Sequence, residues 1–446
     1  MNDEKRFFGH PRGLATLFFT EMWERFSYYG MRAFLILYMV HALGFDDRHA
    51  GRVYGNYTAG VWAAAIVGGI LADQWLGQYR SVLIGGIIIA LGHFTLAFHP
   101  LPFFYTGLSL IVVGTGLLKP NVSGIVGALY EPADTRRDAG FSIFYMGINL
   151  GAFIGPLIAG WLAQKVDWHW GFACAGVGMT LGLLQYVLGR RGLQPAIARL
   201  AAARRPTPVS TATPSAGGVP SEGSGFWGFT PTEWKRIAAM GVFFVFAAIF
   251  WGAYEQAGSS LNLFGDRYTT LRVLGFEFPS SWYVSVQAIF VILLAPAFAW
   301  LWIRLGKYEP TTPTKFAFGL FFVGLSFLFL LIPATAIQGT PGGGLRVSPF
   351  WLVGCYFIQE LGELSISPVG LSVFTKLAPV KIVGMMLGVW FLADSVGNKV
   401  AGYAAGFISS APLPQLFGVV GAVCLGASLI AFAIVKPVKR LMGGVR

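Results

Sequence analysis

Long apolar stretches recur along the whole chain and are separated by short polar ones. Each stretch reaches roughly 20 residues, which is the length of a helix that crosses the hydrocarbon of a bilayer. A helix also satisfies its own backbone hydrogen bonds there. The pattern predicts twelve such helices, at about 14–41, 51–73, 81–98, 102–124, 140–163, 169–189, 234–258, 281–303, 315–334, 348–372, 382–408 and 415–436.

The longest polar stretch divides these helices into two sets of six. Residues 190–232 are rich in proline, alanine, serine, threonine and glycine, and contain no apolar run of helix length. Such a composition predicts a linker of which much is disordered or lies on the surface. We therefore expect one six-helix bundle at 1–189, a linker at 190–232 and a second bundle at 233–446.

Composition and charge agree with a membrane protein. Hydrophobic residues make up 55% of the chain and charged residues 12%, against about 25% charged residues in soluble domains. Most of the 32 lysines and arginines fall on the side of the termini and the linker. The positive-inside rule then predicts that both termini are cytoplasmic, in a bacterial-type inner membrane. Lipid contact and topology account for the net charge of +12, and we expect no nucleic-acid partner.

Two six-helix halves joined by a basic cytoplasmic linker form the layout of the major facilitator fold, whose site lies between the halves near mid-membrane. The segment Gly69-Ile-Leu-Ala-Asp73, followed by Gly77 and Arg80, resembles a loop motif of that superfamily, with Gln74 where a basic residue is usual. The predicted fold class is an all-α polytopic membrane protein with twelve transmembrane helices in two six-helix bundles.

Charged residues inside the predicted helices are the strongest functional signal, because an ionised group in hydrocarbon is costly. In the first helix, Glu21, Arg25, Tyr28 and Arg32 are spaced to share one face, with Glu24 beside them. Two carboxylates next to an arginine predict a proton site in which protonation of a glutamate releases the arginine. A static ion pair that locks helix packing is the alternative.

Four further charges predict a binding site for a zwitterion. Arg32 and Lys119 supply positive charge in the first half, where Pro120 bends the fourth helix. Glu255 and Glu363 supply negative charge in the second half. Opposite charges on opposite walls fit a peptide or an amino acid, although the same charges could only bridge the halves. Weaker candidates are Glu360, Asp394 and Lys399.

Other classes of function fit poorly. No arrangement of histidine and cysteine offers a nucleophile with a base or a metal site, so we predict no enzyme, no metal and no cofactor. A sensor that borrows a transporter fold would keep the charges of the binding site but could lose Glu21 and Glu24, and both are present.

Several motifs resemble those of the proton-dependent oligopeptide transporter family. The run Glu21-Met-Trp-Glu24-Arg25-Phe-Ser-Tyr-Tyr-Gly is similar to its E-x-x-E-R-F-x-Y-Y-G signature. Similar segments follow in the same order in the fourth, fifth, seventh, tenth and eleventh helices, so the resemblance covers nearly the whole chain. They begin at Gly116, Phe141, Phe250, Gly362 and Trp390.

The resemblance implies a role for each matching residue. Glu21, Glu24 and Arg25 would couple proton and peptide. Arg32 would face Glu255, and Lys119 would face Glu363. Arg32 and Lys119 would hold the peptide carboxylate, and Glu363 its amino terminus. The complete set of expected substrate-binding residues is Tyr28, Tyr29, Arg32, Trp62, Lys119, Tyr145, Asn149, Glu255, Gln287, Glu363 and Trp390.

Departures from the family pattern fall in three places. Trp62 stands where a tyrosine is frequent, and Gln287 where an asparagine is usual; both add bulk near the expected binding site. The second helix lacks the histidine of animal members near Gly55, so proton transfer would rest on carboxylates. The linker is too short and polar for the two extra helices of many bacterial members.

The predicted function is proton-coupled symport that imports di- and tripeptides by alternating access. The expected partners are small peptides, protons and membrane lipid, and we expect a monomer. The alternative is a proton-coupled carrier of another anion or amphoteric solute, such as nitrate or an amino acid.

Overall fold

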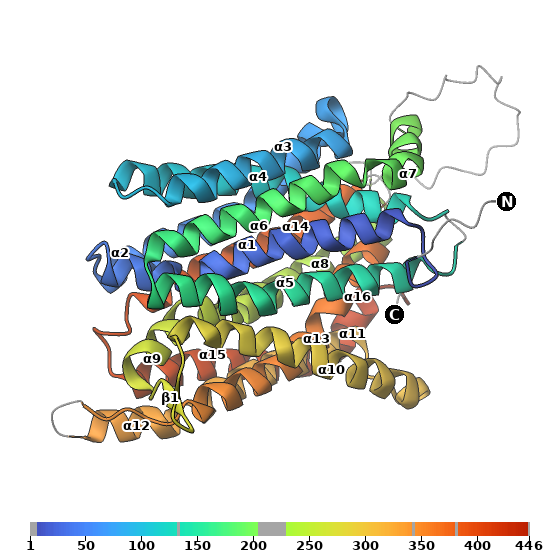
Figure 1. Cartoon of the computed structure of the whole chain (residues 1–446). Coiled ribbons are helices and arrows are strands. Elements are labelled where there is room, and N and C mark those ends of the chain that lie inside the picture. The colour runs from blue at the N-terminus through green and yellow to red at the C-terminus, as the bar shows by residue number, and fades with distance from the viewer. Residues whose placement is uncertain (1–6, 132–133, 204–228, 341–343, 380–381, 445–446) are drawn as a thin grey trace, which may run out of the picture.

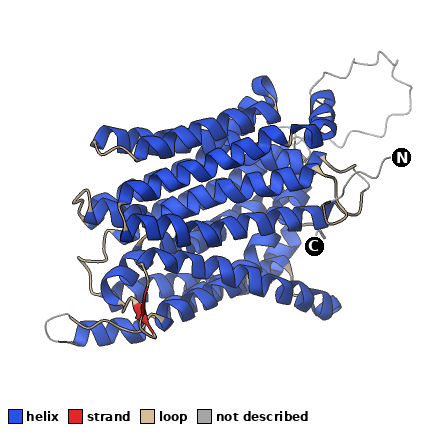
Figure 2. Ribbon diagram, viewed as in Figure 1, coloured by secondary structure: helices blue, strands red, loops and turns tan. Residues whose placement is uncertain are grey.

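The computed structural model describes residues 7–131, 134–203, 229–340, 344–379 and 382–444, which are almost entirely helical (Figure 2). Twelve long helices match the predicted spans within a few residues. They are α1 (Gly13–His41), α2 (Asp47–Leu71), α3 (Gln78–Leu96), α4 (Leu101–Ala128), α5 (Arg137–Lys165), α6 (Trp168–Leu188), α8 (Pro231–Tyr254), α10 (Tyr283–Leu305), α11 (Thr312–Phe329), α13 (Phe350–Leu377), α14 (Val383–Ala405) and α15 (Leu413–Ala433).

Nine spans, counted over the described residues, are long and apolar enough to cross a membrane by length and composition alone. The other three helices, α1, α13 and α14, have 29, 28 and 23 residues. They are the ones that carry the Glu21–Arg25 cluster, Glu363 and Asp394. These carboxyl groups and Arg25 lie in the interior of the protein, whereas Lys376 and Lys399 of the same helices are exposed. The prediction of an all-α membrane protein of the major facilitator type is confirmed.

Shorter elements complete the chain. A π-helical turn, η1 (Ala72–Leu76), extends α2, and α9 (Ser260–Tyr268) and α12 (Leu331–Gly339) extend the seventh and ninth spans. A hairpin of β1 (Arg272–Val273) and β2 (Phe276–Glu277) pairs Arg272 with Glu277. Short 3-10 turns, η4 (Ser280–Trp282) and η5 (Gly306–Tyr308), flank α10, and α16 (Val435–Leu441) ends the chain.

The expected linker begins with a helix, α7 (Arg190–Ala203). Leu193 and Ala196 are buried against the first bundle, and Arg199 donates a hydrogen bond to the carbonyl oxygen of Ala128 (3.0 Å). This part of the linker therefore lies on the surface of the bundle, which is one of the two arrangements that its composition predicted. The prediction of disorder falls mainly on residues 204–228, which lie outside the described residues.

The two chain ends lie on the same side of the helix bundle, which we call the terminal side, and α9, α12 and the β-hairpin lie on the opposite, far side (Figure 1). One hydrophobic core contains the far-side part of the first half together with most of the second half, for example Phe34 with Phe264. A second core, around Leu14 and Tyr186, belongs to the terminal side of the first half alone. The halves therefore share their core toward the far side.

Polar contacts also join the halves on the far side. Arg267 forms a two-pronged ion pair with Asp47 (2.6 and 2.8 Å), and His41 Nε2 lies 2.8 Å from an oxygen of Asp266. Lys165 binds Glu277 of the hairpin (2.5 Å) and lowers the pKa of this exposed carboxyl below its ordinary value. The structure is thus closed on the far side.

Candidate functional site

The first cluster lies on α1, where the predicted helical face is formed. Arg25 Nε binds one oxygen of Glu21 (3.3 Å) and one of Glu24, and all three side chains are at most 2% exposed. The glycine at 151 lets α5 close over the arginine, since a Cβ there would lie 2.2 Å from the carbonyl oxygen of Met22. Glu21 Oε2 and Glu24 Oε1 have no hydrogen-bond partner among the described residues.

The second cluster joins the two halves. Arg32 on α1 forms a buried ion pair with Glu255 and donates a hydrogen bond from Nε to the Tyr54 hydroxyl (2.6 Å). The ring of Tyr28 lies between the two arginines of α1, with the guanidinium carbons of Arg25 and Arg32 at 5.1 and 5.9 Å from its centre. Tyr28 thus connects the ion pair between the halves to the carboxylate cluster.

Glu255 lies at a break in the helix of the seventh span. The α-helical hydrogen bonding of α8 ends at Tyr254, a 3-10 turn, η3 (Glu255–Gly258), follows, and α9 then continues. Breaks of this kind inside a membrane span are tolerated where the backbone is buried in protein. Gly258 lets the turn approach its partners, since a Cβ there would lie 1.9 Å from the Tyr54 hydroxyl and 3.0 Å from Arg32 Nε.

We expect Gly258→Ala to push Tyr54 and Arg32 away from the turn. The added methyl group should cost about 1–3 kcal/mol of stability, as overpacking of a tight interior does, and should weaken the Arg32–Glu255 pair. Thermal unfolding in detergent measures the first effect and solute counterflow the second. Gly241→Ala on α8 is the matched control, because a Cβ there meets no atom within 4 Å; equal behaviour of the two variants would contradict the role of Gly258.

Lys119 does not pair with Glu363 in this structure. Its ammonium nitrogen lies 3.4 Å from the ring centre of Trp62, close enough for a strong cation–π contact. Its electrostatic neighbours are Arg25, Glu24, Glu21 and Asp394. Trp62, which departs from the family pattern, thus contacts the ammonium group of Lys119. The pair of Lys119 with Glu363 stays a prediction for another state of the protein.

Glu363 interacts within its own half instead. The Tyr254 hydroxyl lies 3.1 Å from Glu363 Oε2 and 2.8 Å from Glu360 Oε1, and the Ser367 hydroxyl donates to Glu363 Oε1 (3.2 Å). Glu363 is 7% exposed and Glu360 is fully buried. Tyr145 on α5 lies within electrostatic reach of both carboxyl groups, so this cluster faces the first half.

The remaining predicted residues fall into two groups. Tyr29 lies within electrostatic reach of Arg25, Arg32, Glu255 and Asp394, and so at the centre of the charged clusters. Three others are held by packing or amide contacts. Asn149 donates to the carbonyl oxygen of Tyr145 (3.0 Å), Gln287 donates to the side chain of Gln359 (3.2 Å), and Trp390 packs against Phe374 at 5.3 Å.

Two residues of the clusters, Tyr54 and Tyr254, were missed by the sequence analysis, and two more, Glu360 and Asp394, were named there only as weaker candidates. Tyr54 contacts Arg32, Tyr254 and Glu360 contact Glu363, and Asp394 has Glu255, Lys119 and Arg32 as electrostatic neighbours. Glu360 precedes Glu363 by three residues on one helix, and this spacing was the available signal. No pattern in the sequence points to Tyr54, because its partner lies on another helix.

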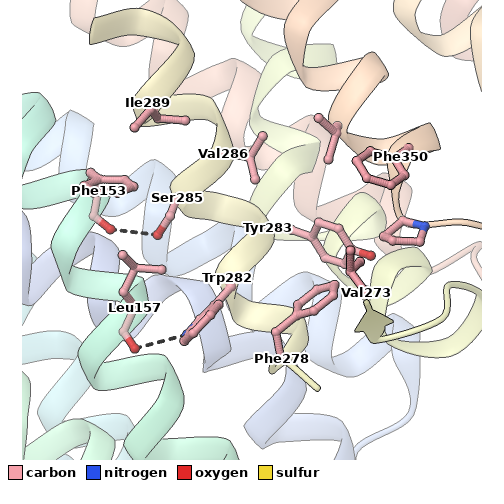
Figure 3. Close-up of a pocket in the computed structure, with 12 residues that line it drawn as sticks. Phe153, Leu157, Val273, Phe278, Trp282, Tyr283, Ser285, Val286, Ile289 and Phe350 are labelled. Atoms are coloured by element: carbon pink, nitrogen blue, oxygen red, sulfur yellow. Dashed lines mark hydrogen bonds between the residues drawn. The ribbon is translucent and has the colours of Figure 1, made fainter. Parts of the chain in front are cut away.

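An apolar pocket opens elsewhere on the seam between the halves. It lies between α5, α10, the hairpin and the start of α13, and is lined by side chains such as Phe153, Val286 and Phe350 (Figure 3). Ser285 of α10 and Trp282 of η4 donate hydrogen bonds to the carbonyl oxygens of Phe153 and Leu157 at its edge. None of the described residues that line this pocket is charged, so the charged clusters are a separate site.

Twelve long helices among the described residues, nine of them apolar enough to cross a membrane, enclose ionisable groups between two halves. Together these features define a polytopic membrane transporter. The model of the POT family matches residues 79–196 and 228–423. The chain therefore belongs to the POT family, as its motifs predicted.

Relatives and solved structures match along almost the full length. An uncharacterized transporter, YclF of Bacillus subtilis, is 41% identical over 99% of this chain and 97% of its own. The peptide transporter YePEPT of Yersinia enterocolitica is 38% identical over the same shares, and a di-/tripeptide transporter of Lactococcus lactis subsp. cremoris is 37% identical over 99% of both chains. A crystal structure of a peptide transporter POT in complex with sulfate has a TM-score of 0.86, 40% identity, and coverage of 99% and 98%.

Proposed function

We propose that this protein is a proton-coupled symporter that imports di- and tripeptides across the inner membrane of a bacterium, with both termini in the cytoplasm. It works as a monomer by alternating access between its two halves. The observation that carries the proposal is the buried ion pair of Arg32 with Glu255, because it joins the two halves through charges that a zwitterion can replace.

Each end of a peptide finds a group of opposite charge. The carboxylate binds Arg32 and Lys119, whose only described contacts at the ammonium group are the ring of Trp62 and long-range charges. The amino terminus binds Glu363. Glu255 is a second negative group for it once Arg32 has left Glu255 to bind the peptide carboxylate. Relatives that are peptide transporters by name support this choice of substrate, and Tyr28, Tyr29, Tyr145, Asn149, Gln287 and Trp390 complete the binding site.

The proton enters on the α1 cluster. Glu21 has a free oxygen in the interior and shares Arg25 with Glu24. A proton on Glu21 removes one of the two negative charges that hold the arginine, and the guanidinium is then free to turn toward Tyr28 or Tyr29, which it already faces. Protonation and substrate binding are linked because these tyrosines also face Arg32.

With the termini in the cytoplasm, as proposed, the far-side contacts support a cytoplasm-facing state for this structure. To accept a peptide from outside, the halves must separate at Asp47–Arg267 and His41–Asp266 and pack together on the terminal side. When a peptide binds, its charged ends replace the Arg32–Glu255 pair. The difference in binding free energy between the two conformations then drives the change from one to the other.

The test is uptake of a labelled dipeptide by proteoliposomes, with and without an inward proton gradient. Counterflow without a gradient shows that the dipeptide is a substrate, and accumulation only with the gradient shows coupling. Accumulation that is independent of the gradient would reject proton coupling. Counterflow of nitrate or a free amino acid, with none of the dipeptide, would favour the alternative substrates.

A further inference from the structure

Two carboxyl groups of α13 lie together in the interior, and neither forms an ion pair with a cation among the residues that the structure describes. Glu360 and Glu363 are three residues apart on one helical face, and the Tyr254 hydroxyl lies within hydrogen-bonding distance of both carboxyl groups. The electrostatic partners of Glu360 among the described residues are Glu363 and Tyr254. The cation expected opposite Glu363, Lys119, is held by Trp62 instead. Two adjacent buried carboxylates without a counter-charge repel each other strongly.

The hydrogen bonds around Tyr254 favour an additional proton. Tyr254 carries one hydroxyl hydrogen, yet its oxygen lies within hydrogen-bonding distance of both carboxyl groups (2.8 and 3.1 Å). An ionised carboxylate only accepts hydrogen bonds, whereas a protonated carboxyl group also donates one. If both glutamates were ionised, one hydrogen would have to be shared between two carboxylates, whereas a proton on one glutamate supplies the second donor.

Glu360 also presents an atom that lacks a partner. Its Oε2 is buried and has no hydrogen-bond donor among the described residues, and the side chain is 0% exposed. A buried acceptor without a donor is destabilising, and more so when it is charged. A proton on this oxygen would remove the charge and would turn the atom into a donor toward Glu363.

We infer that Glu360, Glu363 and Tyr254 form a second proton-binding site, in the C-terminal half, where the two carboxyl groups share one proton. The shared proton leaves a single negative charge, which matches the single positive charge of a peptide amino terminus. When the ammonium group binds Glu363, the proton stays on Glu360. This inference rests on the proposed function only for the identity of the cation that Glu363 binds.

Infrared difference spectroscopy of the purified protein without peptide tests the shared proton. Near neutral pH, the spectrum of the wild type minus that of Glu360→Gln should contain the carbonyl band of one protonated carboxyl group, which shifts in heavy water. Tyr254→Phe should keep this band and move it to higher frequency, since one hydrogen bond is lost. Glu131→Gln is the matched control, because the Glu131 side chain is 77% exposed and should contribute only carboxylate bands.

The opposite result is equally specific. If the difference spectrum of Glu360→Gln shows only the loss of carboxylate bands, both glutamates are ionised and the inference is wrong. Should this variant fail to fold, Glu360→Met removes the carboxyl group with an apolar side chain of similar volume, and its spectrum is read in the same way. The measurement uses no peptide, so its outcome is separate from the dipeptide counterflow that tests the proposed function.

Discussion

Glu21→Gln should abolish the accumulation of dipeptide against its gradient while exchange of dipeptide across the membrane stays measurable. Glutamine keeps the length of the side chain and can still accept a hydrogen bond from Arg25, but it cannot bind or release a proton. One pH unit is worth about 1.4 kcal/mol per proton, or about tenfold in accumulation. Wild-type proteoliposomes should therefore concentrate the peptide about tenfold per coupled proton and pH unit, and the variant should only equilibrate it.

Two measurements separate this prediction from general damage. Counterflow without a gradient shows that the variant still binds and reorients, and Glu131→Gln on the terminal side provides the same chemical change at an exposed position. Tenfold accumulation by Glu21→Gln, equal to that of the wild type, would remove Glu21 from the proton pathway. Loss of counterflow together with accumulation would instead make the residue structural.

Features contained within one helix could be predicted from the sequence. The twelve spans follow from apolar length alone, and the face that joins Glu21 to Arg25 follows from helical spacing. The break at Glu255 was not predicted, because the apolar pattern over 234–258 predicts one continuous span, although Gln256, Gly258 and Ser259 follow the glutamate. Only the close approach of Gly258 to another helix shows why the chain turns there.

Contacts between helices could be predicted only as far as the family resemblance extends. It implied the pair of Arg32 with Glu255, which the structure forms, and the pair of Lys119 with Glu363, which it does not. The difference follows from Trp62, whose ring supplies a local partner for the ammonium group. The sequence showed that Trp62 was unusual, but the direction of its side chain depends on how α2 packs against α4 and α14.

Removing either partner of the Arg32–Glu255 pair should be costly, and the two costs should depend on pH in different ways. Breaking a buried ion pair by deleting one partner typically costs about 3–5 kcal/mol. In Glu255→Ala the arginine stays charged at every accessible pH, because a guanidinium does not lose its proton in proteins. In Arg32→Ala the remaining carboxyl group can take up a proton and lose its charge.

The sign of the pH effect follows from this difference. A glutamate left alone in the interior is more easily protonated in the folded protein than in the unfolded chain, so folding gains stability as the pH falls. Arg32→Ala should therefore recover part of its loss between about pH 8 and about pH 5, whereas Glu255→Ala should stay equally destabilised across this range. Thermal unfolding in detergent at both pH values measures the difference.

The matched control is Arg199→Ala, which breaks the ion pair with Glu131 on the terminal side, where the glutamate side chain is 77% exposed. Water can solvate the carboxylate that remains there, so this variant should lose far less stability, on the order of 1 kcal/mol. Both interior variants should also lose dipeptide counterflow, because a peptide carboxylate needs Arg32 and an unpaired Arg32 would hold it too tightly. An Arg32→Ala variant as stable as the wild type at about pH 8 would show that Glu255 is not held in the interior by this pair, and the site would need a different source of charge between the halves.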